Sequence, residues 1–496
     1  MLKLAPSARA CSNRVDEYRP LCPLARLSRI ARSMTAYGAL IRHVLAPGMD
    51  LLRGTHTMRY LKELEETQWW PRERIEQLQS ERLRRLIHHA YERVPYYRRL
   101  MEASGVRPDS IRTAADLPRL PVLTRTIVRA ETASLLADGF PHRDLLEGHT
   151  GGSSGTPLNF YSSREARLSH GMARSLRAHE WAGLYQGDPF IRVIKRRLPG
   201  TTEGAPFERL SRRVARESLE DCASFSDSTL PAVVERITRM RPRAVRGYAS
   251  AICIIAEFIR DSGMPAPAVG AVVTGGEQLF DEQRALLRDV FGTEPFSKYG
   301  SFENFHIAME CEAHQGMHVA AEDLIVEIVD TEGLPIEPGR QGRVLVTNLH
   351  EFGMPLIRYD MDDESSIIDG PCPCGRALPR LSAVTGKTGN VIYTPSGKRL
   401  SMHTLSSSGL APLGIRQFQF VQERLDHVVV RVVPGTTLTA EEEQALCARI
   451  VAHYHRILGE EVQIDVVVVD RIEPTPAGKH LFLISKVKRP EGQRGS

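Results

Sequence analysis

Several features are scarce in this sequence, and each scarcity excludes a class of protein. The eight cysteines among 496 residues are too few and too scattered for a disulfide scaffold, which predicts a reducing, cytoplasmic setting. No run of about 18 apolar residues occurs, so no transmembrane helix is predicted. Aromatic residues make up 6% of the chain, and no basic stripe is interleaved with them, so a nucleic-acid partner is not expected.

The remaining composition is that of an ordinary globular protein. Hydrophobic residues make up 42% of the chain and charged residues 25%. The 65 basic and 60 acidic residues leave a formal charge of +5, a small excess that suits small anionic ligands. A chain of 496 residues exceeds what one hydrophobic core usually holds, so we expect two or three domains.

The N-terminal end carries little pattern. The first 34 residues are rich in arginine but lack a sustained apolar core, and Asp16 and Glu17 argue against a transit peptide. We expect either a poorly ordered extension or a start codon placed too early, with Met34 or Met49 as the true start. Residues 1–57 are therefore predicted to be an N-terminal extension.

The next two-thirds of the chain predict α/β layers. Residues 58–94 place apolar side chains near helical spacing among charges, which predicts an amphipathic helix that ends before Pro95. Helix-like stretches then alternate with β-branched runs, as a layered α/β fold requires. These runs are residues 244–250, 268–279, 324–330 and 342–349.

The last part of the chain has a different pattern. Strand-like runs at 418–433 and 462–472 flank an amphipathic helix predicted over 439–458. This arrangement predicts a small α+β domain of about 110 residues. With the boundary near Gly386, we expect a large α/β domain over 58–385 and a small, mobile α+β lid domain over 386–496.

A glycine-rich stretch, EGHTGGSSGTPLNFY at 147–161, predicts a loop that holds phosphate. Glycines let the backbone approach a ligand, and the hydroxyl side chains supply donors. The P-loop pattern requires Lys after the last glycine, but Thr156 follows here, so that motif is absent. A flexible linker is the alternative interpretation. The loop residues are Thr150, Gly151, Gly152, Ser153, Ser154, Gly155 and Thr156.

Five further motifs follow this loop in a fixed order. They are TGGEQL at 274–279, KYGSFENF at 298–305, PLIRYDMDD at 355–363, TGKTGNVIYTPSGKRL at 385–400 and PTPAGKHL at 474–481. In this order and at these separations they resemble the adenylate-forming (ANL) superfamily of acyl-CoA synthetases. The branch they resemble contains phenylacetate-coenzyme A ligases, CapK-like proteins and deazaflavin-coenzyme adenylating synthetases.

The resemblance implies a two-step reaction. A carboxylate attacks the α-phosphate of ATP, pyrophosphate leaves, and the thiol of coenzyme A captures the mixed anhydride. It implies that the glycine loop holds the β- and γ-phosphates. It also implies that Gly275, Gly276 and Glu277 lie along the adenine.

The resemblance assigns roles to the later motifs. Tyr299, Gly300 and Ser301 belong to the aromatic-Gly-x-x-Glu pattern, which places Tyr299 on the adenine and makes Glu303 the carboxylate for Mg²⁺. Asp363 accepts hydrogen bonds from the ribose hydroxyls.

Two lysines complete the set. Lys479 matches the catalytic lysine that relatives insert over the α-phosphate, and Lys387 follows the hinge Gly386. This chain carries Thr156, Asp362 and Lys387 where most relatives carry Lys, Gly and Arg.

A cysteine cluster predicts a structural zinc site. Cys372-x-Cys374-Gly suits a thiolate turn, and Cys311 supplies a third sulfur. We predict His318 as the fourth ligand, with His314 as the other candidate. Unpaired buried thiols are the alternative interpretation.

Together these patterns predict an acid-CoA ligase that uses ATP, Mg²⁺ and coenzyme A. Aryl acids such as phenylacetate are favoured by the resemblance, and Tyr248 marks the expected acyl pocket. Two other functions stay open. One is an adenylyltransferase in capsular polysaccharide or coenzyme biosynthesis without CoA transfer, and the other is a non-catalytic nucleotide-binding homologue.

Overall fold

The computed structural model describes most of the chain, and the account below concerns that part. The described residues are 35–150, 158–194, 206–222, 225, 229–385, 391–396, 399–401, 405, 415–473, 481 and 483–487. Within them, no helix combines the length and apolar character needed to cross a membrane.

The described N-terminal residues are helical. They form α2 (Ala36–Leu40), η1 (Ile41–Leu45), α3 (Ala46–Arg53), α4 (Thr57–Thr67), α5 (Arg72–Arg93) and α6 (Pro95–Ala103). Residues 35–53, which belong to the extension expected to be poorly ordered, are held by polar contacts. Arg42 Nη1 donates to Glu180 Oε1 at 2.7 Å, and Asp50 Oδ2 accepts from the backbone N–H of Met58 at 2.7 Å.

The predicted helix over residues 58–94 is two helices in the structure. Pro71, the N-cap of α5, separates them, because α4 ends at Thr67. Pro95 follows the end of α5 and takes the first position of α6, where its missing N–H costs no hydrogen bond. The buried stripe of α5 has helical spacing and consists of Ile75, Leu83, Leu86, Ile87 and Ala90.

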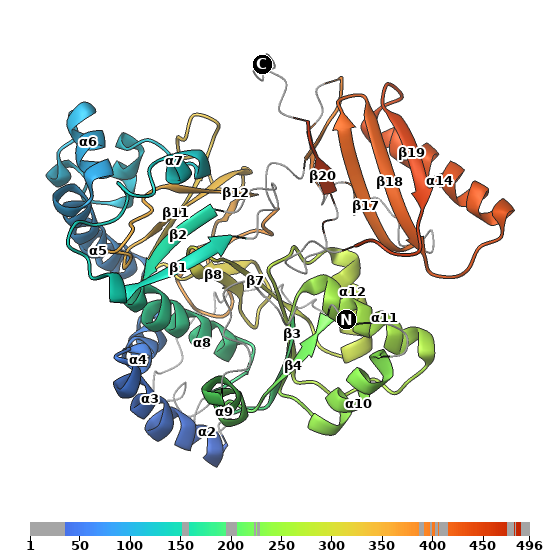
Figure 1. The fold of residues 1–496 in the computed structure, drawn as a ribbon, viewed down its shortest axis with the longest axis horizontal. Coiled ribbons are helices and arrows are strands. Elements are labelled where there is room, and N and C mark those ends of the chain that lie inside the picture. Colours follow the sequence, from blue (N-terminus) through green and yellow to red (C-terminus); the bar gives the residue numbers. More distant parts are fainter. Residues whose placement is uncertain are drawn as a thin grey trace, which may run out of the picture. The chain divides into compact units, whose positions relative to one another are not determined.

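A nine-stranded sheet forms the main framework (Figure 1). Its strands are β3 (Phe190–Ile194), β4 (Glu217–Asp221), β5 (Ala244–Gly247), β6 (Ala271–Gly275), β7 (Phe296–Ser301), β8 (Phe305–Glu310), β9 (Met317–Val319), β13 (Ile367–Ile368) and β14 (Arg380–Leu381). The order is β13-β14-β9-β8-β7-β6-β5-β3-β4. Neighbours from β4 to β7 are parallel, and those from β7 to β13 are antiparallel.

Helices cover both faces of the parallel half of this sheet. Val245 and Val272 pack with α10 (Leu230–Met240), α11 (Ala249–Ser262) and α12 (Asp281–Phe291). Their neighbours Ala244 and Ala271 belong to the core that includes side chains of α8 (Met172–Trp181). Since successive strand residues point to opposite faces, the apolar runs of these strands are buried on both sides.

Smaller elements surround this framework. A three-stranded antiparallel sheet contains β10 (Leu324–Val329), β11 (Gly342–Asn348) and β12 (Tyr359–Ser365). The hairpin strands β1 (Leu145–Thr150) and β2 (Leu158–Ser163) flank the glycine loop. The remaining helices here are η2 (Pro108–Ser110), η3 (Ala114–Arg119), α7 (Arg125–Ala130), η4 (His142–Asp144), η5 (Glu165–Gly171) and α9 (Pro206–Val214).

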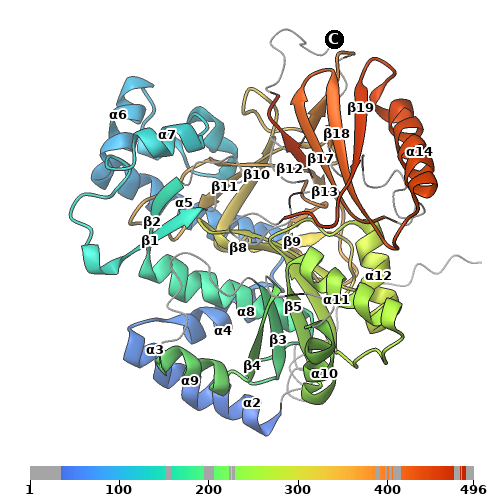
Figure 2. The same cartoon turned by 45° about the vertical axis from the view of Figure 1, so that its right-hand side comes forward.

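The C-terminal residues form the predicted α+β pattern (Figure 2). The four-stranded sheet has the order β19-β18-β17-β20, and α14 (Ala440–Leu458) packs on it through Ile450 and Tyr454. Thr439 opens α14 with a capping box to Glu442, as the predicted helix start requires. The strands are β15 (Val391–Tyr393), β16 (Arg399–Ser401), β17 (Ile415–Arg424), β18 (His427–Pro434), β19 (Gln463–Val468) and β20 (Leu483–Ser485). The predicted α/β fold class with a small C-terminal α+β unit is confirmed.

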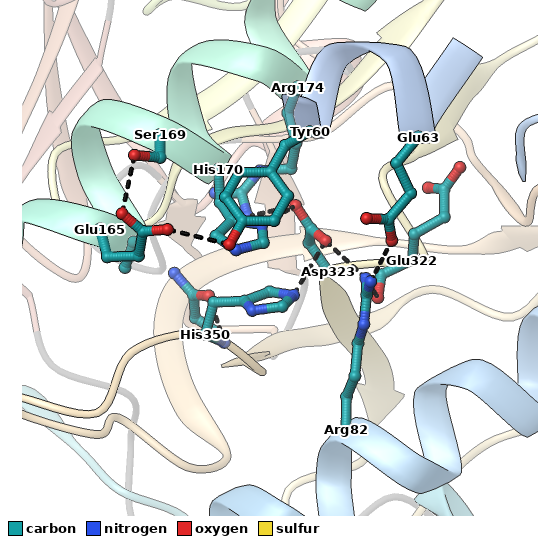
Figure 3. A network of polar contacts seen from close by, with 12 residues as sticks. Tyr60, Glu63, Arg82, Glu165, Ser169, His170, Arg174, Glu322, Asp323 and His350 are labelled. Carbon is teal, nitrogen blue, oxygen red and sulfur yellow. Dashed lines mark hydrogen bonds and ion pairs between the residues drawn. The ribbon is translucent and has the colours of Figure 1, made fainter. Parts of the chain in front are cut away.

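A buried carboxylate, Asp323, joins the N-terminal helices to the framework (Figure 3). Its Oδ1 accepts a hydrogen bond from Arg82 Nη1 on α5 at 2.9 Å, and its Oδ2 accepts one from Arg174 Nη1 on α8 at 3.4 Å. His170 Nδ1 and His350 Nε2 lie 3.3 Å and 3.1 Å from the same carboxylate. Five segments therefore meet at one negative charge.

The geometry of this cluster favours a structural role over metal binding. His170, Asp323 and His350 place three potential ligand atoms within 4.8 Å of one another. The two imidazole rings are stacked, however, with centroids 3.4 Å apart and planes 18° from parallel. A ring nitrogen lone pair lies in the ring plane, so stacked rings direct their lone pairs side by side rather than toward one ion. Two arginines already neutralise the carboxylate.

The same cluster makes stability depend on pH. Burial lowers the pKa of His350 to about 4, although the charge of Asp323 opposes this shift. Burial alone would raise the pKa of Asp323, but the charges and hydrogen bonds of His170 and His350 hold it well below its ordinary value. The unfolded chain therefore binds more protons than the folded chain at acidic pH, and stability falls as pH falls.

We expect the thermal unfolding temperature to fall between about pH 6.5 and pH 4, where unfolded His350 takes up a proton and folded His350 does not. His350→Gln should flatten the profile over this window. Exposed His142→Gln serves as the control and should keep the wild-type slope. An unchanged slope in His350→Gln would contradict the assignment. Differential scanning calorimetry across the pH series provides the measurement.

Candidate active site

Two predicted nucleotide-binding residues meet at the C-terminal end of β7. Tyr299, on β7, donates a hydrogen bond from its hydroxyl to Asp363 Oδ2, on β12, at 2.8 Å. Burial, together with the negative charge of Asp363, raises the pKa of Tyr299 well above its ordinary value. The phenol therefore stays protonated and acts as a donor. Tyr299 and Asp363 were predicted from the sequence to bind the same nucleotide, and the structure brings them into contact.

Glu303 is buried, with 6% of its surface exposed, and is held by two partners that sequence reasoning missed. Its Oε1 accepts hydrogen bonds from the hydroxyl of Tyr359 at 3.0 Å and from Arg125 Nη2 at 3.3 Å. Tyr359 lies inside the PLIRYDMDD motif, and its position in that motif could have predicted that it belongs to the site. Arg125 is the first residue of α7, and its sequence context carries no motif.

Asp362 fits this site for two local reasons. Its φ of 55° lies in the left-handed region, which favours glycine and is tolerated by aspartate. Its carboxylate Oδ2 lies 3.1 Å from Arg125 Nε. Arg125 therefore stands between Asp362 and Glu303 and offsets the extra negative charge.

The predicted adenine-contacting segment needs its glycine. Gly276 has a φ of +76°, and a Cβ there would lie 3.1 Å from the ring carbon Cε1 of Tyr248. Glu277 Oε2 accepts a hydrogen bond from the backbone N–H of Ser250 at 3.0 Å. Gly275 stands beside Lys298, since a Cβ on Gly275 would lie 3.6 Å from the Cβ of Lys298.

The turn after β7 depends on Gly300. A Cβ at Gly300 would lie 2.2 Å from the backbone oxygen of Phe305, where β7 and β8 approach each other. Ser301 Oγ accepts a hydrogen bond from the backbone N–H of Asn304 at 3.1 Å. The turn that leads to Glu303 is therefore closed by backbone contacts.

Some predicted site residues lie outside the described part of the chain. Thr150 ends β1, but its side chain is not described. The residues for which nothing is described are Gly151, Gly152, Ser153, Ser154, Gly155, Thr156, Lys387 and Lys479.

The predicted metal ligands lie together. Cys311, His318, Cys372 and Cys374 place their ligand atoms within 4.8 Å of one another. Cys374 Sγ lies 3.3 Å from His318 Nε2, and the sulfurs of Cys311 and Cys372 are 3.7 Å apart. Strand pairing explains the assembly, because Arg380 of β14 pairs with His318 of β9.

The tautomer of His318 suits metal binding. Its Nδ1–H donates a hydrogen bond to the backbone oxygen of Leu378 at 3.1 Å, which leaves the Nε2 lone pair directed toward Cys374. His314 is not in this group. Its Nδ1 lies 3.2 Å from Glu310 Oε2.

Comparisons with known proteins show the family of this chain. The CapK C-terminal domain model matches residues 392–486. A phenylacetate-coenzyme A ligase of Thermus thermophilus is 30% identical over 348 residues, which cover 68% of this chain and 74% of that protein. The chain belongs to the phenylacetate-coenzyme A ligase family.

A second member of this family, the phenylacetate-coenzyme A ligase of Escherichia coli, is 25% identical over 80% of this chain and 91% of its own. Among solved structures, a 2-hydroxyisobutyryl-CoA ligase in its postadenylation state, in complex with R3-HIB-AMP, aligns with a TM-score of 0.70. It is 19% identical and covers 85% of this chain and 92% of that chain, so it shows the adenylate-forming fold.

Gly300→Ala should destabilise this family member by about 1–3 kcal/mol, because strands β7 and β8 must separate to admit the Cβ. Gly48→Ala is the matched control. It lies in α3 with nothing within 4 Å of the added Cβ, and should stabilise by up to about 1 kcal/mol through helix propensity. Chemical denaturation measures both changes. Equal stability of the two variants would argue against the close approach at Gly300.

Proposed function

We propose that this chain is an AMP-forming acid-CoA ligase. It couples a carboxylic acid to ATP with release of pyrophosphate and then transfers the acyl group to coenzyme A. The observation that carries this function is the meeting of Tyr299, Glu303 and Asp363, three motif residues that the family uses around ATP. Phenylacetate and related aryl acids are favoured, because the curated relatives are named for phenylacetate.

The residues suggest how the nucleotide is held. The ring of Tyr299 and the side-chain-free segment at Gly275 and Gly276 offer a surface for adenine. Asp363 already accepts one hydrogen bond from Tyr299 and has further lone pairs for ribose hydroxyls. Thr150 and the glycine loop that follows it would contact the departing phosphates.

Glu303 fits a divalent cation by its chemistry. A carboxylate oxygen is the ligand that Mg²⁺ prefers, and the bound ion would neutralise charge on the phosphates of ATP. Arg125 and Tyr359 orient Glu303 and keep its carboxylate away from bulk water. Lys479 is proposed as the catalytic cation that stabilises charge on the α-phosphate, and Lys387 as the residue after the hinge.

The two other functions are not favoured. An adenylyltransferase without CoA transfer and a non-catalytic homologue both lack a supporting observation, whereas the matched family members are named as CoA ligases. The CapK C-terminal match lies within residues 386–496, which supports a separate C-terminal domain over that range. The scarcity of cysteine supports a cytoplasmic location.

The function is tested by acid-dependent exchange of pyrophosphate into ATP, followed by thioester formation with coenzyme A. Glu303→Gln keeps the shape of the side chain but removes its charge, so it should lower the exchange rate on the order of 100-fold and weaken its dependence on Mg²⁺. Glu337→Gln, at an exposed position, is the control and should match the wild type. An unaltered Mg²⁺ titration in Glu303→Gln would remove Glu303 from the site.

The cysteine cluster is proposed to hold a structural zinc ion. Three sulfurs and one imidazole nitrogen are the donor set of closed zinc sites, and the four ligand atoms already lie within 4.8 Å of one another. The ion would link the segment after β8, which carries Cys311, to the turn before β14, which carries Cys372 and Cys374. It would thereby keep the surroundings of Glu303 and Asp363 in register.

We expect about one zinc per chain in protein purified without added metal. Cys374→Ser should lower zinc content and thermal unfolding temperature together, because zinc binding contributes directly to folding. Cys447→Ser, on α14, is the matched control and should change neither. Elemental analysis well below one zinc per wild-type chain would contradict the site.

A further inference from the structure

A group of basic side chains beside the proposed nucleotide site has no role in the function described so far. Arg246 is on β5 and Lys298 is on β7, directly before Tyr299. Val273 of β6 pairs with Arg246 on one side and with Phe296 on the other. Paired residues on neighbouring parallel strands point to the same face of the sheet, so Arg246, Val273 and Phe296 share one face. Every second residue of a strand points to the same face, so Lys298 shares it as well.

That face is the one covered by α8. Lys298 Nζ donates a hydrogen bond to Ser175 Oγ of α8 at 2.9 Å. Arg246 Nη1 lies 3.3 Å from His179 Nε2, also on α8. Arg246 and Lys298 are half-buried, so each keeps part of its surface accessible within the fold. Both cations therefore lie on the face of the sheet that α8 covers.

The positive charges are not balanced by the described carboxylates around them. Glu217 acts on Arg246, but its Oε1 already lies 2.6 Å from Arg192 Nε. The charge that acts on Lys298 is that of Arg246 itself. Among the described atoms, Arg246 Nε is buried without a hydrogen-bond partner. A surplus of buried positive charge costs folding free energy unless an anion offsets it.

The directions of the pKa shifts of both cations agree with this surplus. Burial, with the charge of Arg246, lowers the pKa of Lys298 to about 7. Burial, with the charge of Arg192, lowers the pKa of Arg246 to about 10. Both shifts have the sign expected for a cation without a counter-ion, and a bound anion would reverse them.

The position of the cluster connects it to the acyl group. Lys298 lies against Gly275, and the ring of Tyr248, two residues after Arg246, lies against Gly276. Gly275 and Gly276 form the segment that is proposed to lie along the adenine. A substrate joined to the α-phosphate would extend from this segment, and a purely apolar acyl group would supply neither cation with a counter-ion.

We propose that the acid activated by this protein carries a second anionic group, most simply a second carboxylate, which Lys298 and Arg246 bind. This inference rests on the proposed acid-CoA ligase function and narrows its substrate class. An aryl acid with a second carboxylate satisfies both the preference for aryl acids and the requirement for a second anionic group. Lys298 and Arg246 act as specificity residues, since charge-assisted hydrogen bonds to a carboxylate are strong and reject an analogue that lacks it.

The test compares matched acids in the pyrophosphate exchange assay. The pairs are 4-carboxyphenylacetate with phenylacetate and glutarate with butyrate. In the wild type, kcat/KM should be about 10-fold or more higher for the diacid of at least one pair. Lys298→Met and Arg246→Met should each lower the diacid-to-monoacid ratio by about 10-fold or more, and Lys298→Arg should restore much of it.

The outcomes separate this inference from the proposed function. If no acid supports exchange, the acid-CoA ligase function itself fails. If phenylacetate and butyrate are used as well as or better than their diacids, the function stands and the second anionic group is overturned. The comparison of diacids with monoacids in the wild-type protein tests the second anionic group even if a variant does not fold. An unchanged ratio in a folded Lys298→Met protein would also overturn the inference.

Discussion

Burial of both faces of the nine-stranded sheet constrains the rest of this molecule. Helix α8 covers one face of the parallel strands, and α10, α11 and α12 cover the other. A charged side chain on an inner strand therefore needs a partner within the fold or from a ligand. Glu310 of β8 satisfies this requirement, because Arg284 and the backbone N–H of Ser297 bond to its carboxylate at 2.7 Å and 2.9 Å.

The same constraint explains where function is concentrated. Asp323 and Glu322 are buried with arginines of α8. Arg82 of α5 and Thr67 of α4 donate hydrogen bonds to the same two carboxylates and so tie the N-terminal helices to the framework. Lys298 and Arg246 differ from these residues, since Glu217, the carboxylate that acts on Arg246, already pairs with Arg192, and the charge that acts on Lys298 is that of Arg246. A substrate of opposite charge gains most in binding specificity at charges that the fold does not neutralise.

The proposed nucleotide site depends on contacts between elements that are distant in sequence. Arg125 lies 178 residues before Glu303, and Tyr359 belongs to the three-stranded sheet rather than to the large sheet. The cysteine cluster is built in the same way, because β14 pairs with β9 and so brings Cys374 to His318. In both cases tertiary contacts place residues that no local motif connects.

Local patterns in the sequence by themselves determined the α/β layering and the C-terminal α+β unit, because side-chain periodicity and short turns encode these features over a few residues. Motif residues such as Tyr299 and Asp363 were identified through the resemblance of their motifs to a known family. Only the tertiary structure decided that Arg125 and Tyr359 hold Glu303, and that two cations share one face of the sheet. Those relations arise from long-range strand register and helix packing, which bring together residues that lie far apart along the chain.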